Sequence, residues 1–136
     1  MSNAIDKETI ECLIVSAREA AESAYCPYSE YPVGAALLGT DGEVYTGCNV
    51  ENVSYGLSIC AERVAVFNAV SCGCRDFDAL ALAGGKEKAA TPCGACRQVL
   101  AEFCSPEMPV FYADLEYGGI SETNLGKLFP LAFTKQ

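Results

Sequence analysis

Two short cysteine motifs contain the residues of this chain whose types and spacing could do chemistry. Cys60 is followed two positions later by Glu62, and Cys93 and Cys96 form a Cys-x-x-Cys pair. Three thiolates can hold one zinc ion and leave its fourth tetrahedral position open for water, whereas a structural zinc site uses four protein ligands. The pattern predicts a zinc hydrolase that acts on an amino-substituted heterocycle, with Glu62 near the metal-bound water but not a ligand.

Both motifs fall where a loop enters a predicted helix. One helix runs from about residue 60 to 71 after a polar loop over 49–59, and another runs from about 93 to 103 after a loop that holds Gly84 and Gly85. The N-terminus of a helix carries partial positive charge and unpaired N–H groups, so it stabilises a thiolate. Two helix N-termini that converge on one ion would hold three sulfurs with little strain.

The charge of such a site needs compensation. Three thiolates and one Zn²⁺ sum to a net charge of −1 (three negative charges against two positive), which makes a bound water less acidic than at a site of three histidines. Arg63 directly follows the motif of Cys60 and Glu62, and Arg97 directly follows Cys96, so both are candidates to donate hydrogen bonds to the sulfurs. Arg63 is the stronger candidate because it shares a helical turn with Cys60.

Glu62 is the predicted proton carrier of the reaction. It would take a proton from the water, deliver it to a ring nitrogen of the substrate, and pass it on as ammonia leaves. A carboxylate suits these roles when its pKa lies near the working pH, which burial beside the metal would arrange.

The Cys-x-x-Cys pair by itself also fits a redox pair or half of a structural zinc site. A structural site needs a second pair or a histidine; the chain has no histidine, and Cys72 and Cys74 are too close together to form that spacing. A redox pair would leave Cys60 and Glu62 unexplained. Three further cysteines lie in apolar runs and are expected to be ordinary buried thiols: Cys12, Cys48 and Cys104.

Composition and charge exclude several other classes of function. Without histidine, any general base must be a carboxylate or a thiolate. The net charge of −9, with only nine scattered Lys and Arg residues, repels phosphate backbones and disfavours a nucleic-acid polymer as partner. No apolar run approaches the ~20 residues of a membrane span, so no membrane partner is expected. A neutral small molecule fits best.

Cysteine usage and the N-terminus indicate a compartment. Nine cysteines is an odd count, and residues 1–4 begin no recognisable signal peptide. A chain of this length needs no disulfides to stabilise its core. We therefore expect a reducing environment, the cytoplasm.

The remaining pattern predicts one α/β domain over residues 1–136. A helix capped by Asp6 runs to about Ser23, and Asp41-Gly42 joins two strands as a hairpin. A strand, a helix and a strand in succession imply a parallel crossover. The fold class is thus a three-layer α/β/α sandwich with a central mixed five-stranded sheet. Its predicted strands span 33–38, 44–50, 77–83, 109–113 and 119–123, and a short helix spans 125–129.

Five segments together are specific for one family. They cover residues 24–29, 33–37, 47–52, 60–63 and 92–99. From about Ala17 to Phe133 the chain resembles the small, homotetrameric cytidine deaminases. The resemblance implies one Zn²⁺ per subunit on Cys60, Cys93 and Cys96, with Glu62 as proton shuttle. It also implies hydrolytic deamination of cytidine and 2'-deoxycytidine in pyrimidine salvage.

The same resemblance implies where a nucleoside would bind. Asn49 and Glu51 would contact the ribose hydroxyls, and the backbone of Ala61 would receive the pyrimidine carbonyl. The structural alternative is that Asn49 and Glu51 only cap a helix and satisfy backbone groups.

The resemblance also implies residues at a subunit interface, and the sequence departs from the family at one position of the substrate site. Active sites of similar enzymes are completed by neighbouring subunits, which implies that Phe133 and Tyr55 reach across a homotetramer. Tyr31 stands where the family usually has phenylalanine, so one aromatic wall of the substrate site gains a hydroxyl that needs a partner when buried.

Other substrates and one other class remain as alternatives. A deaminase of a modified cytidine, of a blasticidin S-like nucleoside or of a free base would use the same chemistry, although Asn49 and Glu51 favour an intact ribose. A non-catalytic zinc or redox module predicts instead that Glu62 is dispensable and that zinc has four protein ligands.

Overall fold

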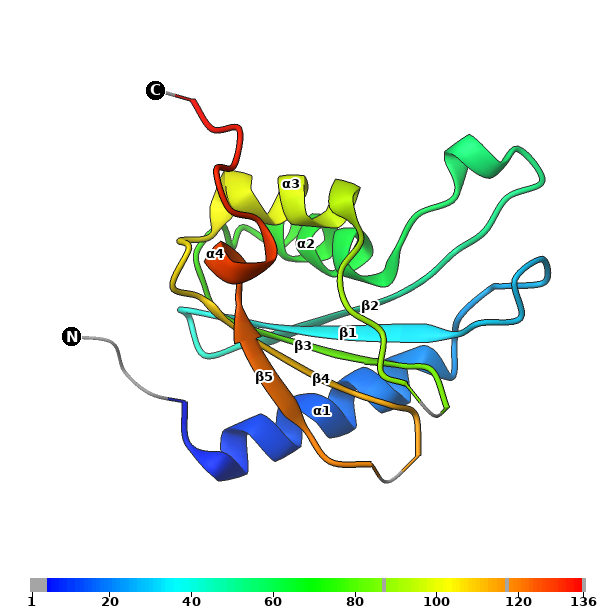
Figure 1. Ribbon diagram of the computed structural model, residues 1–136, viewed down its shortest axis with the longest axis horizontal. Coiled ribbons are helices and arrows are strands. Elements are labelled where there is room, and N and C mark those ends of the chain that lie inside the picture. The colour runs from blue at the N-terminus through cyan, green and yellow to red at the C-terminus, as the bar shows by residue number, and fades with distance from the viewer. Residues whose placement is uncertain (1–4, 87, 117, 136) are drawn as a thin grey trace.

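The computed structural model describes residues 5–86, 88–116 and 118–135. A five-stranded sheet lies between α1 on one face and α2 and α3 on the other (Figure 1), so the predicted three-layer sandwich with a mixed sheet is confirmed. In chain order the elements are α1 (Lys7–Ala21), β1 (Val33–Gly39), β2 (Val44–Cys48), η1 (Tyr55–Leu57), α2 (Ala61–Ser71), β3 (Phe77–Gly84), α3 (Gly94–Phe103), β4 (Pro109–Ala113), β5 (Ser121–Asn124) and α4 (Leu125–Leu128).

The sheet topology brings the starts of two helices to the same edge. The strand order is β2-β1-β3-β4-β5, and β1 is antiparallel to both of its neighbours. It follows that β2 and β3 point in the same direction, so α2 and α3, which follow them, both begin beyond the same edge of the sheet. The crossover from β2 through α2 to β3 is the predicted parallel one. Sheets with parallel crossovers of this kind commonly place ligand sites outside the carboxyl ends of the parallel strands.

The helix α1 covers the other face as its pattern predicts. The Asp6 carboxylate accepts a hydrogen bond from the Thr9 N–H at 2.7 Å, which caps the helix. Five apolar residues recur at helical spacing along α1; Ile10 is half-buried, and the other four are buried, namely Leu13, Ile14, Ala17 and Ala21. A side chain at Gly34 would place its Cβ only 1.8 Å from the Ala17 carbonyl oxygen, so α1 and β1 touch backbone to backbone.

A second close contact sets the position of α2. A Cβ at Gly47 would lie 2.4 Å from the Ala65 nitrogen and 2.5 Å from the Ala61 oxygen. The face of α2 toward the sheet is built from small side chains, because Ala61, Ala65 and Ala69 are fully buried. Since α2 rests directly on β2, the location of its first residues is fixed by the sheet rather than by the preceding loop.

Gly47→Ala is therefore expected to destabilise the fold by about 1–3 kcal/mol, because α2 must move away from β2 to admit a methyl group. The same movement would displace the residues at the start of α2. Urea unfolding measures the effect. Gly56→Ala is the control, since a Cβ at Gly56 meets nothing within 4 Å; equal stability of the two variants would contradict the close contact.

Some sequence expectations about burial were wrong. Cys12 is exposed on α1, and Cys48 and Cys104 are only half-buried, although burial raises the pKa of the Cys104 thiol to about 12. Phe67, a large apolar residue in the middle of α2, is also 50% exposed. The sheet-facing side of α2 carries positions 61, 62, 65, 66 and 69, which puts position 67 on the opposite side.

Element boundaries differ from expectation by a few residues. The second strand ends at Cys48 rather than at 50, and β5 begins at Ser121 rather than at 119. Within the described ranges, the structure contains no helix long and apolar enough to cross a membrane.

Candidate metal centre and active site

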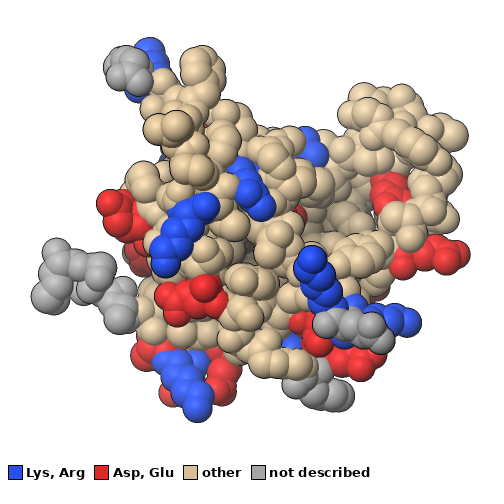
Figure 2. Space-filling view, in the orientation of Figure 1, with Lys and Arg blue, Asp and Glu red and all other residues tan. Residues whose placement is uncertain are grey.

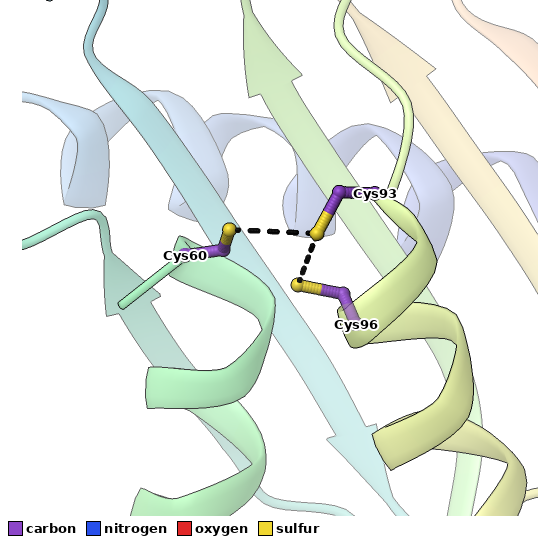
Figure 3. A group of neighbouring side chains, drawn as sticks. All are labelled: Cys60, Cys93 and Cys96. Atoms are coloured by element: carbon purple, nitrogen blue, oxygen red, sulfur yellow. Dashed lines mark hydrogen bonds between the residues drawn. The ribbon is translucent and has the colours of Figure 1, made fainter. Parts of the chain in front are cut away.

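Three cysteine sulfurs converge at the edge of the sheet where α2 and α3 begin. The Cys60 and Cys93 sulfurs are 3.6 Å apart, those of Cys93 and Cys96 are 3.4 Å apart, and all three lie within 4.8 Å of one another (Figure 3). Tetrahedral zinc with Zn–S bonds of about 2.3 Å separates its sulfurs by ~3.8 Å. The cluster has the donor atoms and the dimensions of a zinc site that uses three thiolates.

The helix termini explain why the sulfurs meet. Cys60 is the N-cap of α2 and Cys93 is the N-cap of α3; each has an extended backbone, and neither side chain caps its own helix. Both sulfurs are thus free to turn toward each other. Cys96 lies in the first turn of α3 and is fully buried. The positive ends of two helix dipoles therefore face the cluster, which favours thiolates over thiols.

Hydrogen bonds within the cluster set its proton affinities. The bond shared with the Cys96 thiol, together with a 3.5 Å bond from Arg63 Nη2, lowers the pKa of Cys60 to about 5. Because its proton is held in that shared bond, the pKa of Cys96 is raised. One thiolate thus forms easily even before a metal binds.

Arg63 and Arg97 have different contacts. Arg63 lies beside the Cys60 sulfur, as the sequence suggested, and its Nε is buried without a hydrogen-bond partner among the described residues. Arg97 instead donates to two backbone carbonyls, those of Pro92 at 2.7 Å and Leu128 at 2.6 Å. Arg63 is therefore placed where it could compensate the charge of the sulfurs, whereas Arg97 bonds to the backbone.

Arg63→Gln is expected to make the protein lose zinc at a pH about one unit higher than the wild type does. Arg63 favours the charged form of Cys60, so its removal raises the pKa of that thiol, and protons then compete with the metal over a higher pH range. Zinc release followed with a chromophoric chelator during acidification measures the shift. Arg63→Lys keeps the charge and should give a smaller shift; identical curves for wild type and Arg63→Gln would contradict this role.

Glu62 is buried beside the sulfurs. Its exposed fraction is 4%. Among the residues that the structure describes, no other charged side chain is buried. Burial raises the pKa of Glu62 to about 7. A carboxyl group with this pKa both gives and takes a proton near neutral pH, which is the property required of a proton carrier.

A cavity of about 340 Å³ opens onto Glu62 and the cluster. This volume is within the range of small-molecule sites, which is roughly 300–1,000 Å³. The cavity brings together the predicted residues Tyr31, Asn49 and Ala61 with Glu62, Cys60 and Cys93. Its other lining residues, which the sequence reasoning missed, are Ser29, Val33, Ala90 and Thr91. Ala90 and Thr91 directly precede Pro92, and this adjacency to the metal motif is the signal that could have identified them.

Asn49 and Glu51 hold the backbone of the neighbouring loop. The Asn49 amide accepts from the Val33 N–H and donates to the Tyr31 carbonyl, each at 2.9 Å. The Glu51 carboxylate accepts from the Tyr28 and Ser29 N–H groups, and hydrogen bonding, chiefly from the Ser29 side chain, lowers its pKa. These bonds bear out the backbone part of the structural alternative, but none of them caps a helix.

Neither residue is saturated by those bonds. An amide nitrogen donates two hydrogen bonds and a carboxylate accepts about four, so both Asn49 and Glu51 keep capacity for a ligand. Glu51 lines a second cavity of about 240 Å³ rather than the one at Glu62. Ser29 lines both cavities, so they adjoin.

Tyr55 and Phe133 do not lie at the Glu62 cavity of their own chain. Tyr55 is 73% exposed on the projecting segment between β2 and α2 that carries η1, which we call the arm (Figure 1). It lines the smaller cavity, where its ring centroid is 5.8 Å from that of Tyr28. Phe133 is 82% exposed near the C-terminus. Figure 2 shows that the surface is hollowed between this arm and the body of the molecule.

Comparisons with known proteins agree with this geometry. The family model described as the cytidine and deoxycytidylate deaminase zinc-binding region matches residues 7–112. The cytidine deaminase of Sporosarcina psychrophila is 54% identical over 127 residues, which is 93% of each chain. The crystal structure of the cytidine deaminase from Burkholderia pseudomallei superposes with a TM-score of 0.86 at 47% identity, covering 90% of this chain and 98% of that one. A blasticidin-S deaminase of Bacillus cereus is 27% identical over 116 residues, 79% of this chain and 80% of its own.

Proposed function

Because the chain belongs to the zinc-binding cytidine and deoxycytidylate deaminase family, we propose that it hydrolyses the 4-amino group of cytidine and 2'-deoxycytidine. The products are uridine or 2'-deoxyuridine and ammonia. The observation that carries this proposal is the meeting of a three-sulfur cluster and a buried carboxyl, Glu62, at one cavity.

Cys60, Cys93 and Cys96 hold the zinc ion in this proposal. The support is the sulfur spacing, which fits one tetrahedral ion, and the opening of the cluster into a cavity rather than toward a fourth protein ligand. When bound, zinc lowers the pKa of a coordinated water and so supplies a nucleophile at neutral pH. Arg63 offsets the surplus negative charge of the sulfurs.

Glu62 moves the protons of the reaction. It accepts a proton from the attacking water and donates it to N3 of the cytosine ring. It then takes the second proton of that water from the new C4 hydroxyl and delivers it to the departing 4-amino group, so that the carbonyl forms as ammonia leaves. A pKa of about 7, raised by burial, suits a group that must change protonation twice in one turnover.

The remaining cavity residues bind and orient the nucleoside. Ala61 is the first residue of α2, where N–H groups lack partners within the helix, so its N–H is proposed to bind the pyrimidine carbonyl. Asn49 and Glu51 use their spare capacity on the ribose hydroxyls, and Tyr31 forms an aromatic wall. These groups match a neutral ligand rich in hydroxyls.

We propose further that the protein is a homotetramer whose active sites are completed by Tyr55 and Phe133 of neighbouring subunits. Large apolar side chains exposed on one chain support this, because such patches commonly mark interfaces. Leu131 is fully exposed, and Val53, Leu57 and Phe133 are each more than 60% exposed. The cytoplasm is the proposed location, which agrees with nine cysteines that are all free thiols.

The test is an ultraviolet assay of purified protein with cytidine, with zinc measured per chain. Loss of cytidine absorbance, release of ammonia and about one zinc per chain are expected. 2'-Deoxycytidine, cytosine, an N4-substituted cytidine and blasticidin S serve as further arms. Turnover of blasticidin S or of the N4-substituted nucleoside without turnover of cytidine would replace this proposal with the modified-nucleoside alternative, for which the Tyr31 hydroxyl is the first cause to examine.

A further inference from the structure

The C-terminal segment after α4 presents an aromatic ring to solvent. Leu131 has a φ of 54°, an uncommon backbone conformation for a residue with a branched side chain, and it is fully exposed. Phe133 follows and is 82% exposed. Figure 1 shows this segment leaving α4 and running past α3 toward the C-terminus. A surface segment with two exposed apolar side chains becomes ordered when other residues hold its backbone and a partner covers those side chains.

Two consecutive side chains of α3 hold this segment at both ends. Arg97 donates to the Leu128 carbonyl at the end of α4, and its Nε donates to the Pro92 carbonyl just before the ligand Cys93. Gln98 Nε2 donates to the Phe133 carbonyl at 2.9 Å. We call Arg97 and Gln98 the α3 clamp.

The α3 clamp fixes the backbone of residue 133 and leaves its ring free. A hydrogen bond to the Phe133 carbonyl restrains the direction in which the side chain projects, yet buries none of it. The clamp also begins directly after Cys96, so one turn of α3 positions both a zinc ligand and the tail. Nothing in the Glu62 cavity of the same chain requires Phe133, because the ring does not line it.

We infer that Gln98 is a positioning residue that aims Phe133 into the nucleoside site of a neighbouring copy of this chain. The inference rests on the proposed function, in which Phe133 completes a neighbour's site. Gln98 acts through the hydrogen bond to the Phe133 carbonyl, and Arg97 anchors the root of the same segment. The helix that carries one subunit's metal ligands thereby sets the wall of the next subunit's substrate site.

Gln98→Glu is the informative substitution, because it keeps the shape of the side chain but replaces the donor with a carboxylate that only accepts. Loss of the bond should raise KM for cytidine about three- to tenfold and leave kcat and zinc content unchanged. In a Phe133→Ala background the same substitution should have no further effect. An equal rise in KM in both backgrounds would show that Gln98 acts through general stability and would overturn the inference.

A readout independent of turnover comes from fluorescence, because the chain contains no tryptophan. Phe133→Trp makes position 133 the sole tryptophan, whose emission should be blue-shifted and shielded from acrylamide when a neighbouring copy covers it. Adding Gln98→Glu should shift the emission to the red and increase quenching, whereas Glu102→Ala, an exposed site on the same helix, should change neither.

The inference about Gln98 and the proposed function can be disproved separately. Solvent-exposed emission in Phe133→Trp alone, or emission that Gln98→Glu leaves unchanged, overturns the role of Gln98 whatever the enzyme turns over. If the wild type does not turn over cytidine but the expected emission changes occur, the proposed substrate is wrong. The role of Gln98 in the α3 clamp is then still supported.

Discussion

Glu62→Gln is expected to lower kcat for cytidine by about 10²–10⁴-fold while the protein keeps about one zinc per chain. Glutamine has the size of the buried carboxyl group but can neither accept the proton of the attacking water nor deliver one to the leaving group. Because Glu62 is not among the three clustered sulfur ligands, metal binding should survive. Steady-state kinetics and zinc analysis on the same preparation measure both quantities.

Stability distinguishes this role from a structural one. A buried carboxyl group is costly, and burial has already raised the pKa of Glu62 to about 7. Replacing it with a neutral amide should leave the free energy of unfolding equal or higher, as is common where a site has been shaped for activity. Glu62→Asp, which keeps the acid but shortens its reach, should retain part of the activity. A Glu62→Gln protein that turns over cytidine normally would instead support a non-catalytic zinc module.

The fold could be predicted because its strongest signals are local. Asp6 before an apolar stripe gave α1, and Asp41-Gly42 between two apolar runs gave the hairpin of β1 and β2. Strand-helix-strand order then limited the topology to parallel crossovers. Burial of individual residues was less predictable, because it depends on the rotation of a helix over the sheet. Phe67 and Cys12 lie in apolar stretches, yet both face solvent.

The candidate site was predictable for a different reason. Metal ligands and a proton carrier are restricted to a few residue types, so Cys60, Glu62 and the Cys93–Cys96 pair stood out by type and spacing alone. The sequence favoured Arg63 over Arg97 as the partner of the sulfurs, but it could not show what Arg97 bonds to instead. Arg63 turns toward sulfur and Arg97 toward backbone carbonyls, a difference set by the orientation of each helix.

Contacts between distant segments were beyond sequence reasoning. The bond from Gln98 to the Phe133 carbonyl joins residues 35 positions apart, and the contact of Gly47 with α2 depends on the packing of a helix on a strand. The same holds for Asn49 and Glu51. Their polarity suggested that they bind a ligand, but the backbone groups to which they bond could not be predicted from the sequence. The candidate catalytic residues were identified from their types, and the residues that position them were found only in the structure.

Cys96→Ala is expected to abolish zinc binding and with it cytidine turnover, by at least about 10³-fold, while the chain still folds. Two sulfurs cannot replace three, and the fully buried Cys96 places its sulfur 3.4 Å from that of Cys93. Folding should survive because neither of the two core clusters on either side of the sheet includes Cys60, Cys93 or Cys96.

Thermal unfolding tells whether the loss comes from the metal or from packing. Zinc that binds only the folded state stabilises it by about 4 kcal/mol at a concentration 1,000 times its Kd, so Tm should fall when that binding is lost. Wild type stripped by a chelator should then unfold at the same temperature as Cys96→Ala, and only wild type should regain Tm and activity when zinc returns. If the Tm of Cys96→Ala lies well below that of stripped wild type, the fully buried Cys96 contributes mainly to packing of the core. If Cys96→Ala keeps its zinc, the proposed three-sulfur site is wrong. Coincidence of the two apo curves, with rescue confined to the wild type, would identify the cluster as a catalytic metal site added to an independently stable α/β sandwich.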